Sequence, residues 1–184
     1  MGIKLFGKNI FQVYNHHIMR LEYSNMNCTP LSSELKLRKI DLHNIKEELA
    51  PVGTTVAVAN LDRLVKKNGS MCEGFILCDE HEKDVGTIWV MYKGTNDLEY
   101  RIRNIDAYIF DVFVNSSYRG KGYAGEMIRQ LMEYLHTKGI DSAHLAVSTK
   151  NISAIRAYEK AGFVTVCDHK FARVLKINIP YHKL

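Results

Sequence analysis

The sequence has few of the patterns that mark metal centres, disulfide scaffolds or membrane spans. The four cysteines of the 184-residue chain form no C-x-x-C pair, and a chain of this size with its own core does not need disulfides. Its eight histidines include no H-x-x-x-H helix pair, so we expect no metal site. No apolar run approaches the roughly 20 residues that a transmembrane helix needs. We therefore expect a cytoplasmic protein with reduced thiols and no transmembrane segment.

The chain also lacks a strong excess of either charge. Its 25 Lys and Arg residues against 20 Asp and Glu residues give a formal net charge of +5. This mild excess favours an anionic ligand, but no concentrated basic arm is present, so we expect no nucleic-acid partner. The N-terminus has no apolar core with a small-residue cleavage site and is not read as a signal peptide. The composition, 46% hydrophobic and 24% charged, is that of a folded domain.

The first 33 residues differ from the rest of the chain. Ile10, Tyr14, Ile18 and Leu21 recur at helical spacing, which predicts one amphipathic helix. We expect this helix to dock on the domain or on a partner chain, with attachment to a membrane surface as the less favoured alternative. The predicted organisation is an N-terminal extension over residues 1–33 and a single domain over residues 34–184.

The predicted domain alternates strands and helices. Alternating residues predict a first strand, and a helical stretch follows that Pro51 and Gly53 divide. Three β-rich runs come next without intervening helices, which implies antiparallel pairing. The five segments are residues 34–40, 41–68, 71–80, 85–94 and 107–114.

The last third of the chain predicts two further helices and three strands. A helical period follows the glycine-rich stretch after residue 114 and stops at Lys138-Gly139. A short buried strand over residues 142–147 precedes a second helix over 151–161, which Gly162 stops. Two more strands close the chain. The prediction is an α/β domain, of the α+β kind, with a mixed, mostly antiparallel sheet.

The stretch NSSYRGKGYAGEM admits two interpretations. Its glycines fit G-x-G-x-x-G, the fingerprint of a dinucleotide fold. That fold places the glycines in the first strand–helix turn, with an acidic residue about 20 positions on. Here the glycines come late in the chain, and Ser148-Thr149-Lys150 follows the next strand with no carboxylate. The dinucleotide interpretation fails on this context.

The second interpretation is an anion-binding loop that opens a helix. The segment Arg119-Gly120-Lys121-Gly122-Tyr123-Ala124 follows a strand. The first N–H groups of a helix have no intrahelical partner and lie at the positive end of its dipole. Glycine at positions 120 and 122 would let this backbone curl around a diphosphate. For the loop alone, an ordinary glycine-rich turn is the alternative.

A second motif decides between these alternatives. The segment from Asn151 to Phe163 reads Asn-x-x-Ala-x-x-x-Tyr-x-x-x-Gly-Phe. Together, the loop and this motif resemble the signature of the GCN5-related N-acetyltransferase (GNAT) superfamily. The motifs cover residues 107–163 and the element order covers 34–178. The resemblance implies a GNAT-like mixed, mostly antiparallel central sheet flanked by helices on both faces, and acetyl-CoA as the co-substrate that acetylates amines.

The resemblance also implies roles for individual residues. Tyr158 would act as general acid near the sulfur, although a tyrosine on an amphipathic helix is usually part of the core. Asn151 would bond the pantetheine arm, and it is equally a favoured helix N-cap. The strand before the loop would contribute main-chain contacts. The implied coenzyme-binding residues are Val112, Phe113, Val114, Arg119, Gly120, Lys121, Gly122, Tyr123, Ala124, Gly125, Asn151 and Ala154.

The general base is open. Asp111 interrupts an apolar strand, where a carboxylate needs a partner or a function. Because side chains alternate along a strand, Asp106 or Tyr108 replaces Asp111 if the even-numbered face lines the substrate cleft. Glu73 and His144 are weaker candidates. No cysteine has the context of a nucleophile, so we predict direct transfer in a ternary complex.

The predicted function is acetyl transfer from acetyl-CoA to a primary amine of a small molecule, such as an amino sugar or another metabolite. One alternative is a protein or peptide N-acetyltransferase, for which an open groove would be expected. Another is a non-catalytic module that binds acyl-CoA. A homodimer is a further expectation that the sequence leaves open.

Overall fold

The computed structural model describes residues 2–5, 8–27, 29–32, 34–92, 107–174 and 177–180, and within these ranges the side chains from residue 14 to residue 170. Three short 3-10 turns accompany the regular elements: η1 (Tyr23–Asn25), η2 (Gly69–Met71) and η3 (Ser116–Tyr118). The strands are β1 (Gly2–Leu5), β2 (Lys8–Glu22), β3 (Lys36–Lys39), β4 (Cys72–Cys78), β5 (Asp84–Tyr92), β6 (Ala107–Val114), β7 (Ser142–Ser148), β8 (Val164–Val174) and β9 (Ile177–Pro180). The helices are α1 (Ile45–Leu49), α2 (Val58–Asn68), α3 (Tyr123–Thr137) and α4 (Ile152–Ala161).

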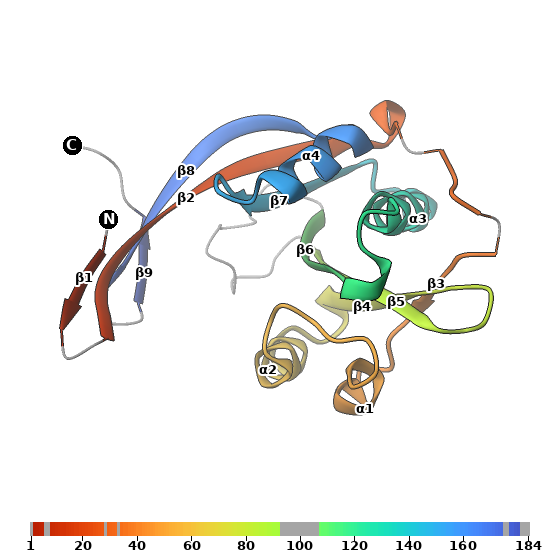
Figure 1. Cartoon of the computed structure of the whole chain (residues 1–184), viewed down its shortest axis with the longest axis horizontal. Helices are drawn as coiled ribbons and strands as arrows, with labels where there is room; N and C mark the ends of the chain where they lie inside the picture. The colour runs from red at the N-terminus through yellow and green to blue at the C-terminus, as the bar shows by residue number, and fades with distance from the viewer. Residues whose placement is uncertain are drawn as a thin grey trace.

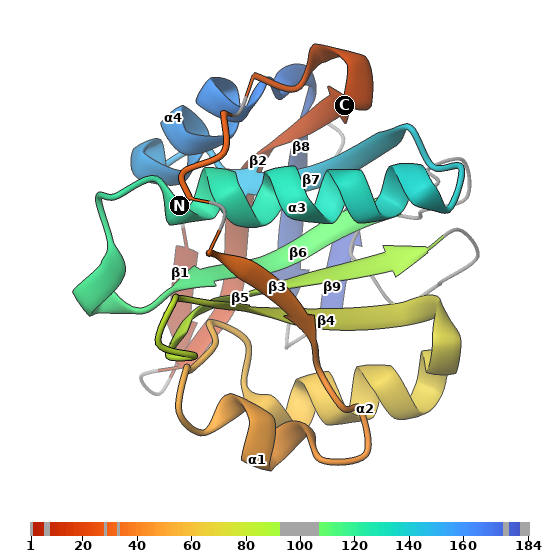
Figure 2. The ribbon, with the colours of Figure 1, turned by 90° about the vertical axis from the view of Figure 1, so that its right-hand side faces the viewer.

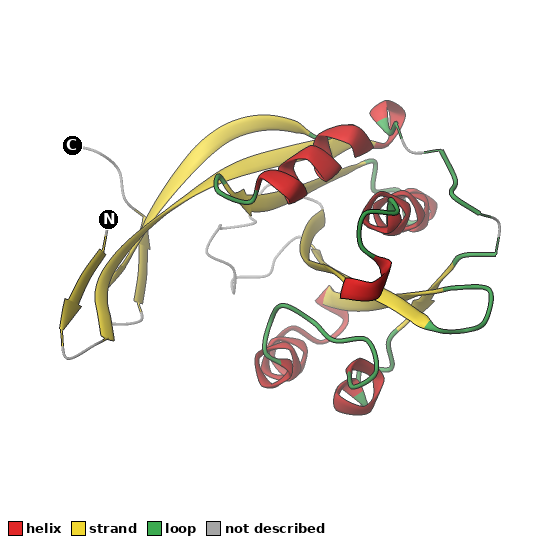
Figure 3. Ribbon diagram, in the orientation of Figure 1, coloured by secondary structure: helices red, strands yellow, loops and turns green. Residues whose placement is uncertain are grey.

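One curved sheet organises the molecule (Figure 1). Its strand order is β3-β4-β5-β6-β7-β2-β8-β9, and β1 pairs with β2. All described strand pairs are antiparallel except β6 with β7. The predicted mixed, mostly antiparallel sheet is confirmed, and so is the antiparallel pairing of β5 with β4 and with β6 (Figure 3).

Helices cover both faces of the sheet, as predicted. Helices α3 and α4 lie on one face, and α1 and α2 lie on the other face below β3, β4 and β5 (Figures 1 and 2). Two groups of buried residues correspond to these layers. Met127, Leu131 and Leu135 of α3 pack in the first group. Leu61 and Val65 of α2 pack with other apolar side chains in the second.

The predicted N-terminal helix is wrong, because residues 8–22 form strand β2. This strand lies inside the sheet, between β7 and β8. Met19 and Leu21 are fully buried with exposed Arg20 between them, which is the two-residue period of a strand. Pairing on both sides satisfies the strand backbone, and this tertiary pairing overrides the local helical spacing. The division of the chain at residue 33 stays a prediction.

Candidate active site

Strands β6 and β7 separate at the centre of the sheet. Their ladder consists of the single pair Tyr108↔His144. Beyond this pair, β6 continues to Val114 with β5 on its other side. The β7-facing edge of β6 therefore leaves the ladder, and its main-chain groups lie where they can bond a ligand.

A β-bulge at Asp111 changes which side chains of β6 face each layer. Phe110 pairs with Trp89 and Phe113 with Thr87, so two residues of β6 oppose one of β5. Asp111 has a φ of 48°, a left-handed conformation at the extra residue. Phe110 packs in the layer of α1 and α2, whereas Val112 packs in the layer of α3 and α4. The strict alternation assumed from the sequence, with 110 and 112 on one face, is therefore wrong.

A cavity of about 630 Å³ lies between the end of β6, the glycine loop and α4. Most of the residues that the sequence implied for coenzyme binding line it together. Lys121 does not, and its Nζ lies 5.9 Å from the centre of the Tyr118 ring. The implied residues at the cavity are Val112, Phe113, Val114, Arg119, Gly120, Gly122, Tyr123, Ala124, Gly125, Asn151 and Ala154.

The glycine loop has the backbone curvature that its sequence suggests. Gly120 and Gly122 have φ values of 78° and 87°, which L side chains rarely adopt. Gly122 is the N-cap residue of α3, so the first N–H groups of this helix, without intrahelical acceptors, border the cavity. Arg119 bends back, and its Nε donates a hydrogen bond to the Val114 carbonyl at 3.0 Å. The loop therefore presents main-chain donors at a positive helix end.

Helix α4 supplies a shallow wall. The Asn151 side-chain oxygen accepts hydrogen bonds from the Ala154 N–H at 3.3 Å and the Ser153 hydroxyl at 3.1 Å. The N-cap role of Asn151 is confirmed, and its contact with a pantetheine arm stays a prediction. Ala154, Ala157 and Ala161 continue the same helix face along the cavity. Small side chains on this face leave room for a ligand beside α4.

Tyr158 is buried next to the cavity but does not line it. Its side chain is 9% exposed and packs with Phe163, the ring centres being 5.8 Å apart. Burial raises the pKa of the Tyr158 phenol to about 12, and the negative charge of Asp111 adds to this effect. The phenol is therefore protonated at neutral pH. Any catalytic role of Tyr158 stays a prediction.

Asp111 fastens the loop between α1 and α2 to strand β6. Its carboxylate accepts hydrogen bonds from the hydroxyls of Thr54 and Thr55. The main-chain N–H groups of Thr55 and Val56 also donate to it, at 2.9 and 3.1 Å. Three of these four donors reach Oδ1 and one, the Thr54 hydroxyl, reaches Oδ2. These contacts favour a positioning role for Asp111 over proton acceptance. Thr55, which Asp111 holds in place, lines the cavity. Asp106, the other predicted candidate, lies outside the described residues.

A buried carboxylate, paired with Arg129, forms part of the cavity wall near the glycine loop. The Glu126 side chain is fully buried, and Arg129 Nη2 lies 2.5 Å from its Oε1. Gln130 Nε2 donates to the same oxygen at 2.7 Å, and the Leu31 N–H donates to Oε2 at 3.2 Å. Burial alone would raise the pKa of Glu126, but these donors together hold the pKa below its ordinary value. Arg129 thus balances a negative charge that would otherwise repel an anion.

Sequence reasoning missed Glu126 and several other residues at the cavity. Ala157 and Ala161 share a helix face with Asn151 and Ala154, so helical spacing alone predicts them. The segment before β3 has no recognisable motif, and only the fold brings it to the cavity. The missed residues are Asn27, Thr29, Leu31, Thr55, Tyr118, Glu126, Ser153, Ala157, Lys160 and Ala161.

The weaker base candidates lie apart from the loop. Glu73 lies toward the C-terminal end of α3, where it accepts hydrogen bonds from Lys39 and Lys138. Neither Glu73 nor His144 lines the cavity. Across the described residues, no group of three or more histidine, cysteine or carboxylate side chains has the arrangement of a metal site. In that same part of the chain, no helix is long and apolar enough to span a bilayer.

Comparisons with known proteins agree with this geometry. The sequence model of the family described as Acetyltransferase (GNAT) family matches residues 42–163. The uncharacterized N-acetyltransferase MJ1207 of Methanocaldococcus jannaschii is 30% identical over 91 residues, which cover 50% of this chain and 39% of that protein. The uncharacterized N-acetyltransferase YycN of Bacillus subtilis is 32% identical over 84 residues, covering 45% and 50%. The chain thus spans half or less of the length of these relatives.

Solved structures share the fold at low sequence identity. A GCN5-related N-acetyltransferase from Sphaerobacter thermophilus has a TM-score of 0.59 at 14% identity, covering 93% of this chain and 55% of that one. A conserved protein of unknown function from Staphylococcus epidermidis has a TM-score of 0.64 at 13% identity, covering 88% and 61%. The dodecameric spermidine N-acetyltransferase of Vibrio cholerae has a TM-score of 0.52 at 18% identity, covering 72% and 81%.

The family match covers well over half of the sequence and includes both the glycine loop and helix α4. The sheet flanked by helices on both faces is the architecture of the GNAT structures that it resembles. On these grounds, the chain belongs to the GNAT family of acetyltransferases.

Proposed function

We propose that this protein is an N-acetyltransferase that transfers an acetyl group from acetyl-CoA directly to a primary amine of a small molecule. The observation that carries the proposal is the cavity that joins the glycine loop, the β7-facing edge of β6 and the Asn151 face of α4. Localisation in the cytoplasm and assembly as a homodimer remain expectations from the sequence.

The residues at the cavity fit coenzyme A. Gly120 has open space where a side chain would stand, and the adjoining N–H groups suit a diphosphate. Cationic Arg119 and Lys160 border the same cavity. A volume of about 630 Å³ is in the usual range of small-molecule sites. When bound, acetyl-CoA supplies an activated acetyl thioester. In this proposal the loop and α3 hold the diphosphate, and the edge of β6 holds the pantetheine arm.

We assign Tyr158 the role of hydrogen-bond donor to the departing sulfur. Its pKa of about 12 keeps the proton on the phenol oxygen at neutral pH. An alkyl thiol has a pKa of about 8.5, so full proton transfer to the thiolate would be uphill by about three pKa units. A donated hydrogen bond stabilises the sulfur without that transfer. Asp111 supports this role because its charge opposes ionisation of the phenol.

The amine must lose a proton before it can attack, because an alkylamine has a pKa of about 10.4. Asp111 already accepts four hydrogen bonds from the loop over residues 54–56, three of them at Oδ1. Asp106 is the remaining carboxylate that the sequence proposed. Proton acceptance by either side chain stays a prediction, and a water chain would serve equally.

The acceptor is proposed as a small metabolite, such as an amino sugar, rather than a polyamine. The spermidine N-acetyltransferase neighbour shares only the fold with this chain. A net charge of +5 does not favour the approach of a polycation, whereas it does favour an acidic or nucleotide-linked amine. A protein or peptide acceptor, or a module that only binds acyl-CoA, remains the alternative.

Calorimetry with coenzyme A and a thiol-release assay with acetyl-CoA test the proposal. The amine panel should contain amino sugars, polyamines, aminoglycosides and peptides. We expect coenzyme A to bind, and at least one small amine to release thiol faster than peptides do. Absence of binding would overturn the assignment. Binding without turnover on any amine would favour the non-catalytic alternative.

Substitution Tyr158→Phe separates catalysis from binding. We expect acetyl-transfer turnover to fall about 10-fold to 100-fold, because the phenol donor to the sulfur is lost. The coenzyme A dissociation constant should stay within about twofold, since in this proposal the glycine loop and the edge of β6 hold the coenzyme and Tyr158 acts only on the departing sulfur. Unchanged turnover would contradict the assigned role and place Tyr158 in the core alone.

A further inference from the structure

The chain between β2 and β3 crosses the N-terminal half of helix α3 (Figure 2). Strand β2 lies between β7 and β8, whereas β3 is an edge strand with β4, β5, β6 and β7 between it and β2. The chain must therefore cross the sheet between β2 and β3. The crossing segment precedes residue 42, where the match to the family begins. We call its described residues 27 and 29–31 the strap.

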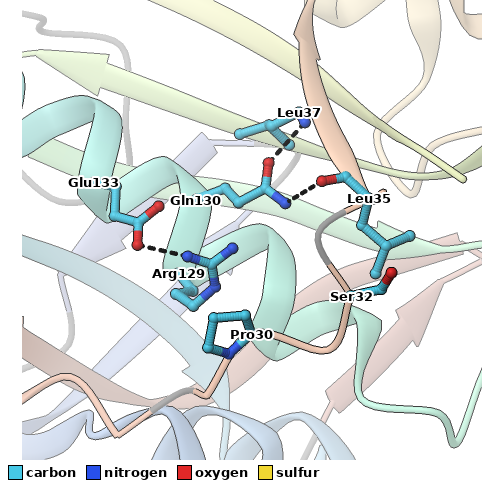
Figure 4. A pocket seen from close by; sticks show the side chains of 7 residues that line it. All are labelled: Pro30, Ser32, Leu35, Leu37, Arg129, Gln130 and Glu133. Carbon is cyan, nitrogen blue, oxygen red and sulfur yellow. Dashed lines mark hydrogen bonds and ion pairs between the residues drawn. The ribbon is translucent and has the colours of Figure 1, made fainter. Parts of the chain in front are cut away.

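The strap and its flanking residues are fastened to both helices of the cavity. The Asn27 N–H donates to the carbonyl of Ala161, at the end of α4, at 3.2 Å. The Leu31 N–H donates to buried Glu126 of α3 at 3.2 Å. A further anchor follows the strap, where Gln130 Nε2 donates to the Leu35 carbonyl at 2.9 Å (Figure 4). The strap is therefore held as part of the folded domain.

The strap also reaches the glycine loop. A Cβ atom placed on Gly122 would lie 3.4 Å from Leu31 Cδ2, which is van der Waals contact. Asn27, Thr29 and Leu31 line the same cavity as Gly122 and Ala124. Leu31 is 48% exposed, so a large apolar side chain remains at the cavity rim rather than in the core. Three described strap residues thus face the space that the loop encloses.

We propose that the strap is a wall of the coenzyme A site, with Leu31 packing against the bound coenzyme next to its diphosphate. The inference rests on the proposed function, because the ligand is the same. The wall comes from chain outside the family match, and it meets the end of helix α4 through the hydrogen bond between Asn27 and Ala161. Its contact slows coenzyme release, whereas the reacting end of the site, near Thr55 and Asp111, does not involve it.

Substitution Leu31→Ala tests the wall directly. Titration of coenzyme A in a calorimeter should show about 10-fold weaker binding, equivalent to about 1.4 kcal/mol. Val166→Ala is the matched control, because Val166 is 50% exposed and does not line the cavity. We expect the control to bind as the unchanged protein does. Equal affinity of the Leu31 variant and the control would overturn the inference.

Hydrogen exchange on the unchanged protein gives a readout that is independent of any variant. Coenzyme A should slow exchange of the strap amides, including the Leu31 N–H, and leave the turn around Gly139, beyond the other end of α3, unaffected. If coenzyme A binds but leaves the hydrogen exchange of the strap amides unchanged, the proposed wall is wrong. Failure of the unchanged protein to bind coenzyme A would instead overturn the proposed function, and the inference with it.

Discussion

The two ends of helix α3 each hold a buried carboxylate among cationic and polar donors, but only one end adjoins the cavity. Toward the C-terminal end, the Glu73 carboxylate accepts hydrogen bonds from four side chains of the protein. Near the N-terminal end, Glu126 is also fully bonded, yet main-chain N–H groups beside it face open space. The donors to Glu73 are Lys39, Tyr92, Tyr134 and Lys138.

The comparison shows that a buried charge by itself does not mark a functional site. Burial opposes ionisation of both carboxyl groups, and in both the neighbouring donors outweigh burial and lower the pKa. Lys138 near the C-terminus of α3 and Glu126 in its first turn both complement the helix dipole. What distinguishes the N-terminal end is the combination of unused main-chain donors with empty volume.

The largest expected effect concerns the ion pair at the N-terminal end. Arg129→Ala should lower the free energy of unfolding by about 3 kcal/mol, because it leaves the fully buried Glu126 carboxylate without its cation. Lys138→Ala should lower it by only about 1 kcal/mol, since Lys138 is 37% exposed and Glu73 keeps three other donors. Urea denaturation of both variants measures the difference. Equal losses of unfolding free energy in the two variants would contradict the difference between the two ends of α3.

A matched pair of glycines separates loop function from helix termination. Gly120 and Gly139 lie beyond opposite ends of α3 with φ values of 78° and 75°, and an added Cβ would meet nothing within 4 Å at either. Alanine at either position should therefore lower stability by about 1 kcal/mol through backbone strain. Only Gly120→Ala should weaken coenzyme A binding, by about 10-fold, because it disturbs the main-chain N–H groups of the glycine loop that would bind the diphosphate. Calorimetry that shows equal affinities for the two variants would remove the special role of the loop.

The smallest effect is the acid dependence of stability. The pKa values of Glu73 and Glu126 in the folded protein lie below the value of about 4.3 expected when unfolded. Their stabilising contribution is therefore complete above about pH 4.3 and is lost as the pH falls through the folded pKa values. Glu73→Gln and Glu126→Gln should each flatten the decline of the urea midpoint below pH 4.3. A variant whose acid limb matches the unchanged protein would contradict the assigned pKa direction at that end.

Most of the central fold was predictable from local patterns. The β-rich runs identified β4, β5 and β6, and Gly139 and Gly162 follow the ends of α3 and α4 as predicted, both with positive φ. Strand β2 was not predictable, because its apolar residues also fit a helical period. Pairing with β7 and β8, far along the chain, decides its structure, and no local pattern records such contacts.

The residues of the candidate site were likewise predictable only in part from local sequence patterns. The glycine loop and the α4 face were predicted from motifs, since their function depends on local backbone geometry and helical spacing. The bulge at Asp111 reverses the facing of later β6 residues, so an assumption of strict alternation assigned the wrong face. The strap reaches the cavity only through tertiary packing, which leaves no motif in its segment, whereas Glu126 lies within the glycine-rich stretch but is not part of the residue pattern that was read there.

The interior position of β2 has a consequence for the order of events during synthesis. His17 of β2 pairs with Asp168 of β8, 151 positions later. Strand β2 can form its short hairpin with β1 at once, but it leaves the ribosome long before β7 and β8 and cannot take its place in the sheet until residues 142–174 have emerged. Such distant pairing slows folding. A nascent chain therefore carries a strand whose residues beyond the β1 hairpin stay unpaired, and exposed to pairing with other chains, until β7 and β8 arrive.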